Sequence, residues 1–149
     1  MMDDEILQDY ASEARELLDE MDASLIRLER EGKSQDLLNN LFRAVHCIKG
    51  SAEYIGLDRS GTLTHAVESL LSRLREGLME LDPRVTDVLF RAKDVITALI
   101  DEVTTGREEK TDISGMMAEL AALAQITTPL SRGDRSVEPM IEADRKSVV

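Results

Sequence analysis

The chain has 149 residues, and its 42% hydrophobic content suits one packed domain with a short appendage rather than two independent cores. Aromatic residues make up only 3% and Trp is absent, which disfavours a sheet and favours aliphatic side chains packed between helices. The formal net charge of -12 would repel a phosphate backbone, which argues against DNA and RNA as partners.

The sequence gives no sign of export or of membrane insertion. Its single cysteine, Cys47, cannot form an internal disulfide, and the N-terminus begins with acidic residues instead of a basic stretch followed by an apolar one. No apolar run approaches the ~18 residues needed to cross a bilayer. We therefore expect a cytoplasmic protein without direct membrane contact.

Two long amphipathic helices are predicted first. Apolar residues recur at three- and four-residue steps from Asp4 to about Arg30, where Gly32 is expected to end the first helix. The pattern resumes near Ser34, a candidate N-cap, and stops at Gly56.

Two further helices follow with short connections. The third begins at about Arg59 and loosens near Gly77, with a stripe of leucines along one face. The fourth opens with Asp82 before Pro83, a capping acid followed by the residue that suits the first helical position, and Gly106 closes it.

A shorter fifth helix is predicted from about Asp112 to Ile126, where it could dock on the bundle. Short loops turn the chain back on itself, so the fold class is all-α, an up-down-up-down antiparallel four-helix bundle with a short fifth C-terminal helix. We place the domain at 1–126, and 127–149 as a linker-like flexible tail.

On the second helix, His46 lies roughly 130° from the centre of the apolar stripe and should face solvent or a groove edge. Phe42, Lys49, Gly50 and Glu53 lie on the same face. Glycine inside a helix costs about 0.5–1 kcal/mol relative to alanine, but it leaves bare backbone that another molecule could approach. Lys49 supplies a cation that could stabilise a phosphoryl group. These residues predict a docking platform around an exposed imidazole.

On the third helix, His65 points away from the leucine stripe, whereas Glu68 lies between the solvent face and that stripe. Glu68 is thus placed to meet His46. A carboxylate that accepts the Nδ1 hydrogen of an imidazole fixes the tautomer and leaves Nε2 as a nucleophilic lone pair.

Two segments resemble a known family. LFRAVHCIKGSAEYIGL, residues 41 to 57, is similar to the phosphorylation-site helix of histidine-phosphotransfer (HPt) domains, in particular those at the N-terminus of chemotaxis histidine kinases of the CheA type. THAVESLLSRLREG, residues 64 to 77, resembles the next helix of the same domains. The similarity in helix lengths and order extends over roughly residues 4 to 126.

The resemblance implies a role for each matching position. His46 would accept the phosphoryl group, Glu68 would orient it, Lys49 and His65 would tune its reactivity, and Gly50 would give clearance to the incoming domain. The implied partners are the catalytic domain of a histidine kinase and the receiver domain of a response regulator. ATP and Mg²⁺ would belong to those partners, so this domain would need no cofactor and would not be an enzyme on its own.

Other interpretations stay open at this point. The chain could be the leading part of a kinase or a free-standing phosphotransfer protein, and it could also be a helical interaction module in which His46 is incidental. A metal-dependent bundle enzyme using His46, His65 and Glu68 ranks lower, because no paired ligand motif is present. Cys47 is predicted to be a partly buried apolar residue rather than a nucleophile served by its neighbour His46.

Overall fold

Five helices account for most of residues 4–125, the part of the chain that the computed structural model describes. No strand occurs in that range. The helices are α1 (Asp4–Glu31), α2 (Gln35–Tyr54), α3 (Asp58–Arg75), α4 (Pro83–Gly106) and α5 (Ser114–Ala124). The all-α prediction and the predicted order of four long helices and one short one are confirmed. The predicted tail at 127–149 lies outside the described residues.

Local signals in the sequence set most of the helix ends. The Ser34 side chain accepts a hydrogen bond from the Leu37 N–H at 3.3 Å, and the Asp82 carboxylate accepts one from the Val85 N–H at 3.1 Å. Gly32 ends α1 with a φ of 88°, a left-handed conformation that costs glycine little. These caps explain why the predicted boundaries of α1, α2 and α4 lie close to the observed ones.

The end of α4 differs in detail from the prediction. Gly106 is the last helical residue, and the left-handed position falls on Arg107, with a φ of 62°. The Arg107 N–H still bonds to the Val103 carbonyl, and the Arg107 side chain pairs with Asp4 of α1. The glycine therefore marks the end of the helix without forming the turn itself.

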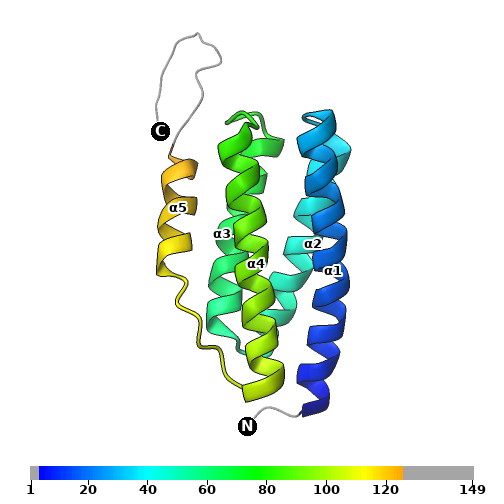
Figure 1. The fold of residues 1–149 in the computed structure, drawn as a ribbon, viewed down its shortest axis with the longest axis vertical. Helices are drawn as coiled ribbons and strands as arrows, with labels where there is room; N and C mark the ends of the chain where they lie inside the picture. Colours follow the sequence, from blue (N-terminus) through cyan, green and yellow to red (C-terminus); the bar gives the residue numbers. More distant parts are fainter. Residues whose placement is uncertain (1–3, 126–149) are drawn as a thin grey trace.

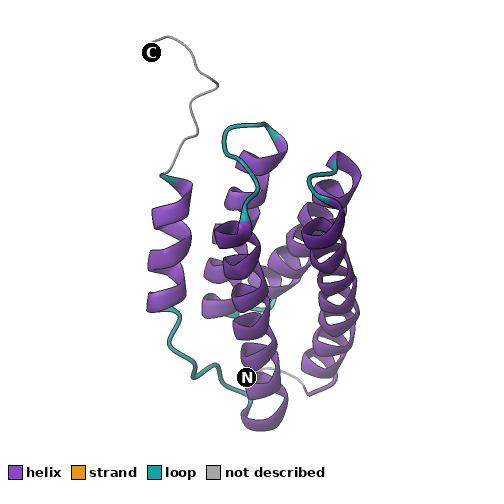
Figure 2. Cartoon of the chain, turned by 45° about the horizontal axis from the view of Figure 1, so that its top comes forward, coloured by secondary structure: helices purple, strands orange, loops and turns teal. Residues whose placement is uncertain are grey.

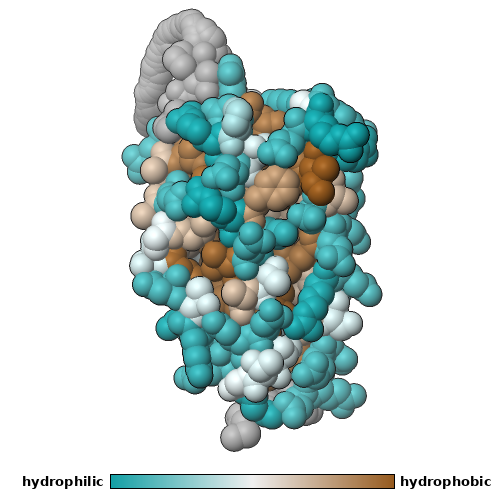
Figure 3. Space-filling view, viewed as in Figure 1, coloured by the Kyte–Doolittle hydropathy of each residue, from teal (hydrophilic) through white to brown (hydrophobic). Residues whose placement is uncertain are grey.

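The helices form an antiparallel bundle in which α1 lies between α2 and α4, and α3 lies on the other side between the same two (Figure 1). The connections alternate between the two ends of the bundle (Figure 2). Aliphatic side chains fill the centre, and those with no exposed surface include Leu25, Leu38, Leu41, Leu63, Leu70 and Leu89. The face seen in Figure 3 is mostly hydrophilic, with small separate apolar patches. No helix within residues 4–125 combines the length and apolar character needed to span a membrane.

The short helix α5 packs against α3 and α4, outside the four-helix bundle (Figure 1). The α4–α5 connection is bound to the start of α3 through the carboxylate of Glu109. The N-cap residue of α3, Leu57, offers no side-chain hydrogen bond, and Glu109 supplies one instead. The two carboxylate oxygens of Glu109 accept hydrogen bonds from the backbone N–H groups of Arg59 and Ser60, each at 2.8 Å. The connection thus caps α3 at N–H groups that lie 50 and 49 residues earlier in the chain.

We expect Glu109→Ala to lower the free energy of unfolding by about 1–2 kcal/mol, because two N–H groups of α3 lose their partner. Urea denaturation followed by circular dichroism measures the effect. Glu108→Ala removes an exposed neighbouring charge and should change stability by less than about 0.5 kcal/mol. Equal stability of the two variants would contradict the capping role of Glu109.

Candidate functional site

The buried stripe of α2 leaves His46 on the outer part of the helix. Leu41, Val45, Ile48 and Ala52 face the core with at most 1% of their surface exposed. The side chain of His46 is 59% exposed, at about mid-length of the helix. The imidazole is therefore held by a rigid element and stays open to another molecule.

Glu68 of α3 meets His46 across the α2–α3 interface. The Nδ1 atom of His46 is hydrogen-bonded to Oε2 of Glu68, whose side chain is only 11% exposed. The other carboxylate oxygen, Oε1, accepts a hydrogen bond from Nζ of Lys49 at 2.8 Å. Lys49 is itself only 18% exposed and binds the carboxylate, so the three side chains form one connected network.

The network fixes the charge of Glu68. Burial raises the pKa of Glu68, but the hydrogen bonds from Lys49 and His46 outweigh that effect and hold the pKa below its usual value. The same carboxylate raises the pKa of Lys49. Because an ionised carboxylate can only accept hydrogen bonds, Nδ1 of His46 must carry the hydrogen. In the neutral form of the ring, the lone pair therefore lies on Nε2.

Phe42 lies one turn before His46 and contacts it directly. The two rings are stacked, with an interplanar angle of 8° and centroids 5.9 Å apart. Phe42 is half-buried, and the guanidinium carbon of Arg75 lies 4.0 Å from its ring centroid. Arg75 was not among the residues singled out from the sequence. It lies two turns beyond Glu68 on α3, and that spacing is the signal that could have identified it.

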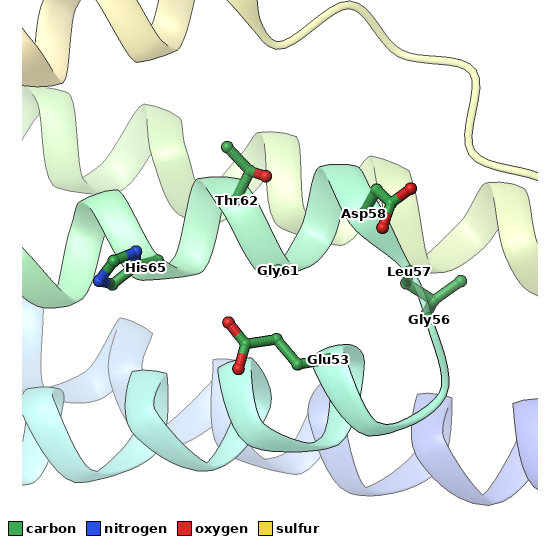
Figure 4. Close-up of a pocket in the computed structure, with 7 residues that line it drawn as sticks. All are labelled: Glu53, Gly56, Leu57, Asp58, Gly61, Thr62 and His65. Carbon is green, nitrogen blue, oxygen red and sulfur yellow. The ribbon is translucent and has the colours of Figure 1, made fainter.

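Gly50, Glu53 and His65 lie farther from the imidazole. Gly50 is exposed, and a β-carbon added there would meet no atom within 4 Å. Glu53 and His65 line a polar groove of about 280 Å³ between the end of α2 and the start of α3, where the Glu53 side chain lies beside Gly61 (Figure 4). Within residues 4–125 no hydrogen bond joins His65 to His46 or to Glu68. The structure thus brings together His46, Glu68, Lys49 and Phe42, and leaves His65 in the neighbouring groove.

Cys47 is exposed, and the prediction that it is partly buried was wrong. It immediately precedes the buried Ile48, but successive helical residues diverge by about 100°, which carries Cys47 to the outer face. In the described part of the chain, no three side chains of His, Cys, Asp or Glu gather in a way that could hold a metal ion.

Comparison with known proteins identifies the family to which this geometry corresponds. The family model "Hpt domain" matches residues 5–106. The sensor histidine kinase CheAY of Helicobacter pylori is 39% identical over 101 residues, which cover 66% of this chain and 13% of that protein. The chemotaxis protein CheA of Treponema pallidum is 31% identical over 117 residues, 78% of this chain and 14% of that protein. This chain therefore spans about a seventh of the length of these relatives.

A solved structure has the same fold. The phosphorylated P1 domain of CheA3 from R. sphaeroides, in complex with CheY6, superposes with a TM-score of 0.75 and 29% sequence identity. The match covers 82% of this chain and 97% of that chain, so the similarity extends over the whole of that domain.

The Glu68 network should make stability depend on pH. A carboxyl group whose pKa is lower in the folded chain than its ordinary 4.5 stabilises the fold above that value, and this contribution is lost as the pH falls through the folded pKa. We expect Glu68→Gln to be less stable than the unchanged chain near pH 6, and the difference to shrink near pH 3. Urea denaturation at both pH values measures it.

Glu16→Gln, on the exposed surface of α1, is the control and should show no such convergence. A stability difference between Glu68→Gln and the unchanged chain that is the same at both pH values would argue against the ionised network.

Proposed function

The chain belongs to the Hpt domain family, and from this premise we propose that it is the phosphocarrier of a chemotaxis-type phosphorelay. His46 accepts a phosphoryl group from a histidine kinase domain and donates it to an aspartate of a response regulator. The observation that carries this proposal is the contact between the exposed His46 and the buried, ionised Glu68. A histidine that is incidental to an interaction module needs no such partner.

We propose further that the chain is the phosphotransfer part of a larger kinase. Two of its relatives are a sensor histidine kinase and a chemotaxis protein, and it aligns with 13% and 14% of their lengths. The R. sphaeroides P1 domain is phosphorylated and bound to CheY6. By this similarity the partners are a kinase catalytic domain and a CheY-like receiver domain, and the compartment is the cytoplasm.

In the first step the lone pair of His46 Nε2 attacks the γ-phosphorus of ATP held by the kinase domain. A P–N bond forms, the bond to the β-phosphate bridging oxygen breaks, and ADP leaves. The ring gains positive charge as the bond forms, and the Glu68 carboxylate at Nδ1 stabilises that charge. Lys49 keeps the carboxylate ionised and oriented through its bond to Oε1.

In the second step a carboxylate oxygen of the regulator attacks the same phosphorus. The P–N bond breaks, an acyl phosphate forms on the aspartate, and His46 returns to a neutral ring with its hydrogen on Nδ1. The Mg²⁺ needed for both steps would be held by the partners, which also supply most of the electrostatic stabilisation. This chain positions the nucleophile.

The incoming domains approach His46 from its outer side. Glu68 contacts His46 from α3 and Phe42 stacks on its ring from one turn earlier on α2, whereas Gly50, one turn further along α2, presents bare backbone. Tyr54, a further turn along, is 90% exposed. Flat backbone followed by an exposed aromatic ring offers a partner both close approach and apolar contact.

Incubation with a cognate kinase and ATP tests the phosphoacceptor. We expect His46→Gln to abolish labelling while helicity is retained, and Glu68→Gln to slow labelling by about ten- to a hundredfold, the range for partners that fix the orientation of a histidine. Phosphate retained at another residue in His46→Gln would reject His46 as the acceptor, and an unchanged rate in Glu68→Gln would remove Glu68 from the mechanism.

Gly50 allows the docking side to be tested separately from the fold. Gly50→Ala should raise the free energy of unfolding by about 0.5–1 kcal/mol, because the added methyl group meets no atom of the chain. The same variant should slow transfer to the receiver domain, and Gly50→Leu should slow it more. Stopped-flow measurement of transfer from the phosphorylated domain gives the rates.

Gly115→Ala in α5 is the matched control, since it too lies in a helix and faces open space. It should leave transfer unchanged. If Gly50→Leu transferred at the normal rate, the partner would not approach over Gly50.

A further inference from the structure

Arg75 is a cation beside the site that the mechanism above leaves unused. It lies in the last turn of α3, and its guanidinium covers the ring of Phe42. Its backbone carbonyl accepts a hydrogen bond from Nε2 of Gln35 at 3.2 Å, which joins the end of α3 to the first turn of α2. No carboxylate pairs with Arg75 within residues 4–125, whereas Lys49 is bound to Glu68.

The Arg75 guanidinium thus contacts an aromatic ring, and that ring contacts the nucleophile. Phe42 and His46 lie almost parallel. The stacked Phe42 ring opposes rotation of the imidazole out of the plane parallel to it. The hydrogen bond to Glu68 keeps the Nδ1 edge of the imidazole turned toward α3. Together the two contacts determine where Nε2 points.

Phe42 needs support to act in this way. It packs against the edge of the core but is only half-buried, so its exposed side leaves the ring room to adopt other rotamers unless a neighbour covers it. The guanidinium at 4.0 Å from its centroid restricts that freedom from the α3 side. Arg75 is thereby linked to the imidazole through one intervening ring.

We propose that Arg75 is a positioning residue for phosphoryl transfer. It holds Phe42 parallel to His46, and so keeps Nδ1 on Glu68 and Nε2 toward the open side. This inference rests on the proposed function and adds a residue to which the mechanism above gives no role. A direct contact between Arg75 and the phosphoryl group is the competing explanation.

A small phosphoryl donor tests the proposal without any docking protein. With phosphoramidate, Nε2 forms a P–N bond as the donor's own P–N bond breaks and ammonia leaves. We expect Arg75→Met to be phosphorylated about two- to fivefold more slowly, the factor that a cation–π contact at an exposed site supplies. Arg30→Met removes a cation from the last turn of α1, as Arg75→Met does from the last turn of α3, and should keep the normal rate.

The position of the rings is measured independently by NMR. In Arg75→Met the ring-proton shifts of His46 should move toward those of Phe42→Leu, which lacks the stacked ring altogether. Arg75→Lys keeps a cation and should restore part of the shift and part of the rate. Normal shifts and a normal rate in Arg75→Met would overturn the proposal.

A double-mutant cycle separates positioning from direct contact. If Arg75 acts through Phe42, adding Arg75→Met to Phe42→Leu should slow phosphorylation no further. Additive losses would overturn the proposal in favour of a direct contact with the phosphoryl group. Absence of phosphorylation in the unchanged chain, with both kinase and phosphoramidate, would instead reject the proposed function, while the NMR shifts would still decide whether Arg75 positions Phe42.

Discussion

The hydrogen bond between His46 and Glu68 is the constraint on which the arrangement of the site depends. It can form only if α2 and α3 pack at one register, with an outer residue of α2 opposite a nearly buried carboxylate of α3. A buried carboxylate is costly unless it is paired, and Lys49 and His46 together supply the partners. The bundle therefore provides both the low exposure that strengthens the contact and the rigid helices that hold its geometry.

Residues after 106, where the match to the family model ends, also hold α3 in place. Glu109, past residue 106, caps α3, and Arg91 of α4 forms two hydrogen bonds to Glu119 of α5 at 2.7 and 2.8 Å. Burial raises the pKa of Tyr10 and the nearby Glu109 carboxylate acts in the same direction, against a lowering effect of Ser60, for a pKa of about 12, so α1, α3 and the α4–α5 connection meet at one point. The short fifth helix is thus attached to the helix that carries Glu68.

Much of the fold could be predicted because its signals are local. The Ser34 and Asp82 caps and the three- to four-residue apolar spacing each act within a few turns of helix. The pairing of His46 with Glu68 could also be predicted, since the helical phase places His46 clear of the apolar stripe of α2 and Glu68 between the stripe of α3 and the solvent. The cap from Glu109 could not, because no local pattern in the α4–α5 connection points to the start of α3, 50 positions earlier. Arg75 was missed although its two-turn spacing from Glu68 places both residues on the same face of α3. The exposure of Cys47 was mispredicted although its helical phase alone places it on the outer face.

The closed flank of His46 toward α3 limits how the imidazole can be used. With Glu68 on that side and Phe42 stacked on the ring, the donor and the acceptor of the proposed phosphorelay would share one direction of access to Nε2, and two folded domains could not occupy it together. Binding of the two domains would then be mutually exclusive, so the donor must dissociate before the acceptor can bind. In such a carrier, turnover is governed by competition and residence time as much as by the chemistry at nitrogen.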